Sequence, residues 1–222
     1  MIDYLQKGGP LVWLLIVCSV LVVTTFFSRW SYFHRCSIRV PDFLRGLQNL
    51  VQRKNYAEAL HECAGTPGPV ARVVHAAIQR HESPRTELKA IVQEAGQLEV
   101  PELERGLTLM ASLALIAPMI GLLGTVAGLI DAFTTISAQS GFTSSTDIAR
   151  GIYQALLSTA AGIGVAIPAS IGYALLSSRV NRLMHDMERA GIEIVNLLND
   201  ARQTDDGIIE FQAGEKATAT RR

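Results

Sequence analysis

The sequence predicts an all-α membrane protein with three transmembrane helices, a cytoplasmic helical bundle, and long cytoplasmic extensions of the second and third helices. Three uncharged stretches are each long enough to cross a bilayer, which takes about 20 apolar residues. Charged segments with helical periodicity lie between and after them. The composition agrees, because 49% of the 222 residues are hydrophobic and 18% are charged, against about 25% charged in soluble domains.

The uncharged stretches are residues 8–28, 106–130 and 151–178. With their flanking residues, they predict transmembrane helices at 10–30, 106–136 and 151–178. The first stretch is longer than the apolar core of a signal peptide, and basic residues follow it in place of a small-residue cleavage site. We therefore expect the first helix to be retained in the mature protein.

Lysine and arginine are distributed unevenly between the segments that join the spans. The segment from Arg29 to Arg105 holds eleven and the chain from Arg179 onward holds seven, whereas the N-terminal lead and the loop between the second and third spans hold one each. Basic residues concentrate on the cytoplasmic side of a membrane. The lead 1–9 and the loop 137–150 are therefore predicted to lie outside, and 31–105 and the C-terminal tail inside.

The cytoplasmic segment 31–105 is predicted to form several short helices, broken at Thr66-Pro67-Gly68-Pro69. Pro101, followed by acidic residues, predicts the start of the helix that enters the membrane. The third helix is predicted to continue through 179–203, and 204–222 to be disordered. Apolar residues recur there at helical spacing: Leu176, Val180, Leu183, Met187, Ala190, Ile194, Leu197 and Ala201.

The second span is rich in small residues. Gly124 and Gly128 have the spacing that lets two helix backbones approach closely in lipid, and Gly121 precedes them by one turn. Pro118 is predicted to kink this helix. A hydroxyl, Thr125, lies in the middle of the span, and the carboxylate of Asp131 ends the uncharged run, either as an ion-path residue or solvated at the outer interface.

The third span carries a similar mixture. Gln154 and Ser158 are four residues apart and share a face, with Thr159 about 100° round the helix. Such side chains either line a polar path or bond to carbonyls of their own helix. The span also contains small residues predicted to permit close packing, Gly162 and Gly164, and a proline predicted to kink it, Pro168.

These motifs resemble a known family. Residues 117–128 read APMIGLLGTVAG and residues 151–169 read GIYQALLSTAAGIGVAIPA. Together with the short outer loop, they are similar to the MotA/TolQ/ExbB ion-channel family and closest to its ExbB and TolQ branch. The resemblance is clear over roughly residues 100–180.

The resemblance implies a ring-forming subunit of the bacterial inner membrane, assembled as a homopentamer around a dimer of single-span partners of the ExbD or TolR type. Ion flow past an aspartate on the partner would drive force transmission toward the outer envelope, with a TonB-like envelope-spanning protein as a further candidate partner. Thr125 and Thr159 match the family's path-lining threonines.

The sequence departs from the family where ExbB and TolQ carry a glutamate, because residue 154 is Gln. Glutamine offers a carbonyl oxygen but cannot take up and release a proton. We therefore consider Asp131 a candidate ion relay, with the partner's aspartate as the alternative proton carrier. The oxygen groups of Gln154, Ser158 and Thr159 would suit Na⁺ as well as H⁺.

Other function classes have less support. Zero net charge without a basic stripe argues against nucleic-acid binding. No metal-ligand spacing, disulfide framework or catalytic constellation is present, so neither a metal, a cofactor nor enzymatic activity is expected. A small membrane enzyme is thus disfavoured, whereas a non-conducting scaffold of the same fold stays open because of Gln154.

Overall fold

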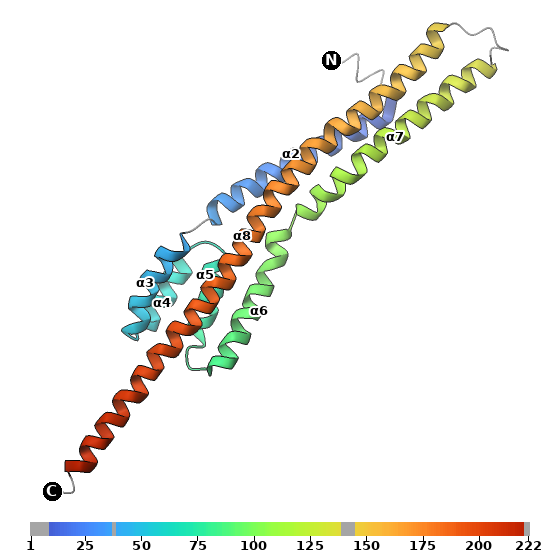
Figure 1. The fold of residues 1–222 in the computed structure, drawn as a ribbon. Coiled ribbons are helices and arrows are strands. Elements are labelled where there is room, and N and C mark those ends of the chain that lie inside the picture. The colour runs from blue at the N-terminus through green and yellow to red at the C-terminus, as the bar shows by residue number, and fades with distance from the viewer. Residues whose placement is uncertain (1–8, 37–38, 139–144, 220–222) are drawn as a thin grey trace. The chain divides into compact units, whose positions relative to one another are not determined.

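The computed structural model describes residues 9–36, 39–138 and 145–219, which form helices joined by short turns, with no strand among them (Figure 1). The elements are α2 (Gly9–Cys36), α3 (Val40–Gln52), α4 (Tyr56–Gly65), α5 (Pro69–Gln79), α6 (Arg85–Glu104), α7 (Leu107–Ala138) and α8 (Ser145–Ala219). Three stretches are long and apolar enough to cross a membrane, and they fall in α2, α7 and α8. The all-α class and the three membrane-capable helices are confirmed.

The chain divides into two compact units, which we describe separately. The first unit comprises residues 1–31 and 104–178 and contains the apolar part of α2, all of α7 and the first part of α8. The second comprises residues 32–103 and 179–222 and contains α3 to α5, nearly all of α6 and the rest of α8.

In the first unit, α7 and α8 run side by side in opposite directions (Figure 1). Most large apolar side chains of these helices point outward, and Leu115, Leu122 and Phe133 each expose more than 60% of their surface. Apolar exposure on this scale is expected of helices that meet lipid or other helices.

The second unit has the core of a water-soluble domain. Its buried side chains are large and aliphatic, α3 packs against α4, and α4 packs against α5. The α8 stripe predicted from the sequence is buried from Leu176 to Ile194, after which Val195 and Leu198 are buried and Leu197 is only half-buried. The core residues of this unit that are fully buried and largest are Leu44, Leu47, Val51, Val70, Ile78, Leu88, Leu103, Ile194 and Leu198.

The structure corrects the predicted start of the second membrane helix. Pro101 lies inside α6, and the break comes at Arg105-Gly106, where Gly106 has a φ of +81°. A positive φ suits glycine and ends the α6 helix, whereas Pro101 lies three residues before the end of α6. The extension before α7 is therefore a separate helix.

The predicted segment boundaries and the helix ends also differ. α7 reaches Ala138 and α8 begins at Ser145, so helix takes up both ends of the predicted loop 137–150, whose residues 139–144 lie outside the described residues. The same holds for residues 1–8 of the predicted N-terminal lead. α8 extends to Ala219, and the disorder expected from residue 204 onward stays a prediction. No proline follows Pro168 to interrupt this helix.

Candidate functional site

The α7–α8 pair is held together by small residues whose backbones touch. A Cβ atom added at Gly162 would lie 2.7 Å from the Ala117 carbonyl oxygen and 3.0 Å from the Gly121 Cα. One added at Gly121 would lie 2.9 Å from the Ser158 carbonyl oxygen. Because real Cβ contacts are not this short and the neighbours are backbone atoms, these two positions accept only glycine.

The contact continues toward the C-terminal end of α7 and the N-terminal end of α8. An added Cβ at Gly124 would lie 2.5 Å from the Ser158 Cβ, and one at Gly128 would lie 3.1 Å from the Ala155 Cβ. Gly151, which the sequence analysis did not single out, closes the series against Ala132, at 2.8 Å. Gly151, Ala155, Ser158 and Gly162 thus form one small-residue face of α8.

Gly164 does not belong to this face. A Cβ added there would meet no atom within 4 Å, although the residue lies only two positions from Gly162. Two residues along a helix correspond to a rotation of about 200°, so the two glycines point in nearly opposite directions. Close packing at Gly164 would therefore require a second chain.

Ser158 lies inside the helix pair. Ser158 is only 2% exposed, and its hydroxyl donates a hydrogen bond to the Gln154 carbonyl oxygen at 3.0 Å. This is the back-bonding to the preceding turn that serine makes in apolar surroundings. The Ser158 hydroxyl is thus engaged within the pair, against Gly124.

The two threonines also donate to carbonyl oxygens, in two different ways. The Thr125 hydroxyl bonds the Leu122 carbonyl of its own helix at 2.6 Å. The Thr159 hydroxyl crosses to α7 and bonds the Gly121 carbonyl at 3.2 Å. This second bond depends on the glycine contact, because only closely approaching backbones place an α7 carbonyl within reach of an α8 hydroxyl.

The polar residues lie on the two edges of the α7–α8 contact, that is, on either side of the line along which the two helices touch. One edge faces α2, because Leu15 of α2 packs in a cluster with Ile120 of α7 and Ala161 of α8. Asp131 follows Ile120 by eleven residues, about three turns, and Gln154 precedes Ala161 by seven, about two turns. Asp131 and Gln154 therefore continue the α2-facing edge toward the C-terminal end of α7 and the N-terminal end of α8.

Thr125 and Thr159 belong to the opposite edge. Thr125 lies five residues from Ile120, a rotation of about 140°, and Thr159 lies two residues from Ala161, a rotation of about 160°. Both residues are half-buried in the single chain. The Thr159 hydroxyl, which was expected to act together with Gln154, is therefore separated from it, and the two threonines form their own edge, away from α2.

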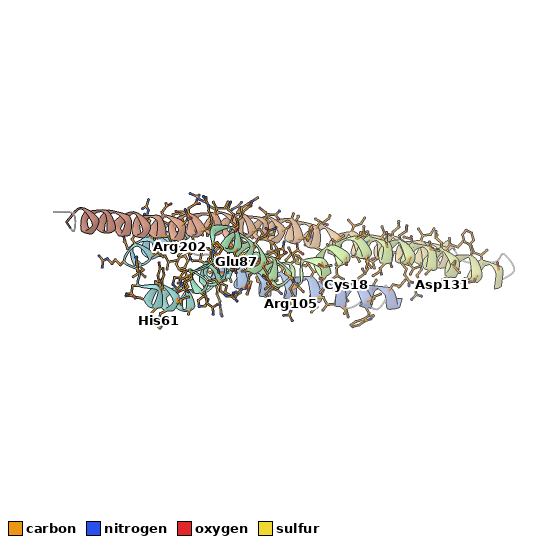
Figure 2. The ribbon with its side chains drawn as sticks, turned by 90° about the horizontal axis from the view of Figure 1, so that it is seen from below. Cys18, His61, Glu87, Arg105, Asp131 and Arg202 are labelled. Carbon is orange, nitrogen blue, oxygen red and sulfur yellow. The ribbon has the colours of Figure 1, made fainter. Side chains whose placement is uncertain are left out.

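Asp131 is exposed in the single chain and lies in the C-terminal part of α7 (Figure 2). Its backbone carbonyl accepts hydrogen bonds from the hydroxyls of Thr134 at 3.0 Å and Thr135 at 2.8 Å. No ion pair of its carboxylate is found among the described residues. Pro118 and Pro168 lie inside α7 and α8 without ending them, so the kinks at these prolines stay predictions.

The second unit has no comparable polar site among its described residues. No group of three or more His, Cys, Asp or Glu is arranged to hold a metal ion there or elsewhere in the described chain, and His61 lies exposed on α4 (Figure 2). The main polar contact of the second unit joins α5 to α6. Arg72 donates hydrogen bonds to both carboxylate oxygens of Glu99, one of them through Nε at 2.7 Å. The Glu99 side chain is 16% exposed, so this pair is structural in character.

Three membrane-capable helices, a backbone-to-backbone helix contact and polar side chains along its edges define a helical membrane protein of the channel or transport type. Residues 66–189 match the family described as the MotA/TolQ/ExbB proton channel family. The chain belongs to this family.

Its relatives span several bacterial lineages. An ExbB-like biopolymer transport protein of Synechocystis sp. is 31% identical over 202 residues, which are 87% of this chain and 77% of the relative. Biopolymer transport protein exbB1 of Vibrio cholerae is 29% identical over 199 residues, 86% of this chain and 85% of its own length. Tol-Pal system protein TolQ of Haemophilus influenzae is 41% identical over 88 residues, 40% of this chain and 38% of its own.

Proposed function

We propose that the protein is the ion-conducting stator subunit of an inner-membrane energy-transducing motor, coupling H⁺ or Na⁺ flow to force transmission toward the outer membrane or its transporters. The observation that carries the proposal is the Thr125–Thr159 edge of the α7–α8 pair. Two hydroxyl oxygens lie on the same edge of a glycine-packed contact between two apolar helices, in a chain that belongs to the MotA/TolQ/ExbB family.

The hydrogen bonds of the two threonines favour cations. Each hydroxyl has one proton to donate, and both protons are already given to carbonyl oxygens, of Leu122 and of Gly121. What these hydroxyls can still offer is a lone pair. An edge that presents oxygen lone pairs within an apolar span suits a proton-carrying water or a sodium ion and repels an anion.

The remaining polar residues are proposed to take lesser parts. Ser158, buried in the helix contact, holds the Gln154 turn in place. Gln154 contributes a carbonyl oxygen but no titrating group. Asp131 acts as an ion relay, and no cofactor is required.

The assembly follows the family. The chain would form a homopentamer around a dimer of single-span, ExbD- or TolR-like partners that supply a membrane aspartate, with a TonB-like protein carrying force across the envelope. Relatives named for biopolymer transport and for the Tol-Pal system support partners of this class. The N-terminus would be periplasmic and the C-terminus cytoplasmic.

The test is ion flux through the chain co-purified and reconstituted with its single-span partner. Thr159→Val removes the hydroxyl and keeps the shape, and we expect flux to fall at least tenfold. Thr24→Val is the matched control, because Thr24 bonds a carbonyl of its own helix at 2.7 Å on α2, away from the proposed path. Equal flux for the two variants would remove the threonine edge from the mechanism.

The transported ion is tested in the same vesicles. Flux that persists without Na⁺ and collapses with the pH gradient identifies the proton and excludes sodium. Flux that requires Na⁺ at a constant pH gradient identifies sodium.

A second candidate is a non-conducting scaffold that keeps the same fold, and the observation that favours it is Gln154 in place of a carboxylate. The two proposals differ in one measurement. A scaffold assembles with its partner and shows no flux above that of empty vesicles, in the wild type as well as in Thr159→Val.

A further inference from the structure

Asp131 and Gln154 lie next to the same two contacts of the helix pair. Gly128 meets Ala155, and one turn further out Ala132 meets Gly151. Asp131 directly precedes Ala132, and Gln154 directly precedes Ala155. Along the helix axes, Asp131 is three residues outward of Gly128 and Gln154 one residue outward of Ala155, so their depths differ by about 3 Å.

Asp131 and Gln154 also share an edge. They lie on the same helix faces as Ile120 of α7 and Ala161 of α8, which pack against Leu15 of α2. The backbones beneath them are close, because a Cβ added at Gly128 would lie 3.2 Å from the Ala155 backbone nitrogen. Helices this close leave no room for side chains between them, so residues at the edge extend along it. A carboxylate and an amide are thereby placed at the same level on one side of the pair.

The charged groups around this edge are few. Arg150 lies on α8 one turn outward of Gln154, on the same stripe, and is exposed. The apolar part of α2, from Gly9 to Ser28, contains no charged residue. An acid in such a span is costly and needs a compensating partner. The partner is either the arginine, in an ion pair, or a cation held with the help of the glutamine oxygen.

We propose that Asp131 and Gln154 form a monovalent-cation site on the α2-facing edge, separate from the Thr125–Thr159 edge, in which the carboxylate supplies charge and the Gln154 Oε1 a neutral oxygen. The ligand is H⁺ or Na⁺. The proposal rests on the proposed function in so far as α7 and α8 cross a membrane along which cations move. In this site α7 supplies the acid and α8 a supporting oxygen.

The site is tested by carbodiimide labelling of the full chain with its partner in membrane vesicles. Dicyclohexylcarbodiimide adds to protonated carboxyl groups in apolar surroundings, and peptide mass spectrometry reads the label at Asp131 separately from any partner acid. We expect Asp131 to be labelled, with labelling that declines as pH rises. If the ligand is Na⁺, NaCl protects and the same concentration of choline chloride does not; if it is H⁺, only pH matters.

The variant that decides is Gln154→Leu. It should raise the NaCl concentration needed for protection at least tenfold or, in the proton case, change the extent of labelling at fixed pH at least threefold. Thr159→Val, on the other edge, should leave the labelling of Asp131 unchanged. Labelling that is absent in the wild type or indifferent to Gln154→Leu overturns the site.

Two further outcomes distinguish the cation site from an Asp131–Arg150 ion pair and from the proposed path along the threonine edge. If Asp131 becomes reactive only in Arg150→Gln, it is an ion-pair partner and the cation site is wrong. If Thr159→Val leaves flux intact while the labelling of Asp131 depends on Gln154, the proposed path along the threonine edge fails and the Asp131–Gln154 site stands.

Discussion

The α7–α8 pair of the first unit and the core of the second unit are stabilised by different kinds of contact. In the α7–α8 pair the contact is made by glycine, alanine and serine, and large side chains such as Leu122 are turned outward. In the second unit the contact is made by large side chains, with Leu47 and Ile78 completely buried. The α7–α8 contact excludes large side chains, whereas the core of the second unit is filled with them.

The difference follows from the surroundings of each unit. In water, burying a leucine gains about 2 kcal/mol from the hydrophobic effect. Lipid is as apolar as leucine, so helices that meet there gain from close backbone contact and from interhelical hydrogen bonds. The Thr159–Gly121 bond is of this second kind and depends on the absence of a side chain at Gly121.

The largest expected effect concerns the filled core. Leu47→Ala removes a fully buried side chain of α3 and should lower the free energy of unfolding of the second unit by about 2–5 kcal/mol, because the cavity cannot fully collapse. Hydrogen exchange of the α3 to α5 amides in the full chain measures it. Leu98→Ala is the control, since Leu98 is 73% exposed and its loss should cost under about 0.5 kcal/mol.

The next effect concerns the small-residue contact, where adding one methyl group should do harm. Gly162→Ala pushes a Cβ against the Ala117 carbonyl and should destabilise the helix pair by about 1–3 kcal/mol, as overpacking does. Gly164→Ala adds the same methyl where no atom lies within 4 Å and should be neutral or stabilise by up to about 1 kcal/mol through helix propensity. Thermal unfolding of both variants in detergent measures the pair, and equal midpoints would contradict the assignment of the interface.

A smaller effect tests the ion pair of the second unit. Glu99→Gln keeps the shape of the side chain and removes the charge that faces Arg72, so we expect a loss of about 1 kcal/mol. The pair is half-exposed on the arginine side, so the difference from wild type should shrink in high salt. Glu94→Gln, on the exposed face of α6, is the control, and a loss equal to that of Glu99→Gln would show that the pair contributes nothing specific.

The smallest effect concerns Cys63, whose burial, reinforced by the nearby Glu62 carboxylate, raises the pKa of the thiol to about 12. The folded chain therefore keeps its proton at pH values where the unfolded chain, with a pKa of about 8.5, has lost it. Stability contributed by this group is complete below about pH 8.5 and declines as pH rises toward 12.

Alkylation by iodoacetamide at pH 9 measures this, in a chain whose other two cysteines are serine. The reaction should be at least tenfold slower in the folded chain than in the urea-unfolded one, because both burial and protonation oppose it. Equal rates would show that α4 opens readily.

Much of the fold could be predicted from the spacing of charges and apolar residues. The three spans follow from the uncharged stretches, and the buried α8 stripe from Val180 to Ile194 follows from its three- and four-residue steps. The turn before α7 could not be predicted, because Pro101 has the features of a helix start and the actual break depends on a positive φ at Gly106.

The sequence predicted which residue types make up the candidate site, but it did not predict how these residues are arranged. Gly162 and Gly164 look alike in the sequence, and only the partner helix decides which one packs. The same holds for the hydroxyls, since Ser158 and Thr159 are adjacent yet one lies inside the contact and the other reaches across to Gly121. Gly151 was missed although it continues the small-residue spacing of Ala155.

The turn at Gly106 bears on how the chain is made. A Cβ there would lie 3.1 Å from the Thr25 Cγ2 and 3.3 Å from the Arg29 Nε, so this turn is shaped against α2. The ribosome produces α2 first, and the N-terminal part of a chain generally folds first during synthesis. Newly made α7 therefore meets a surface that is already in place, whereas its contact with α8 must wait for the last span to emerge.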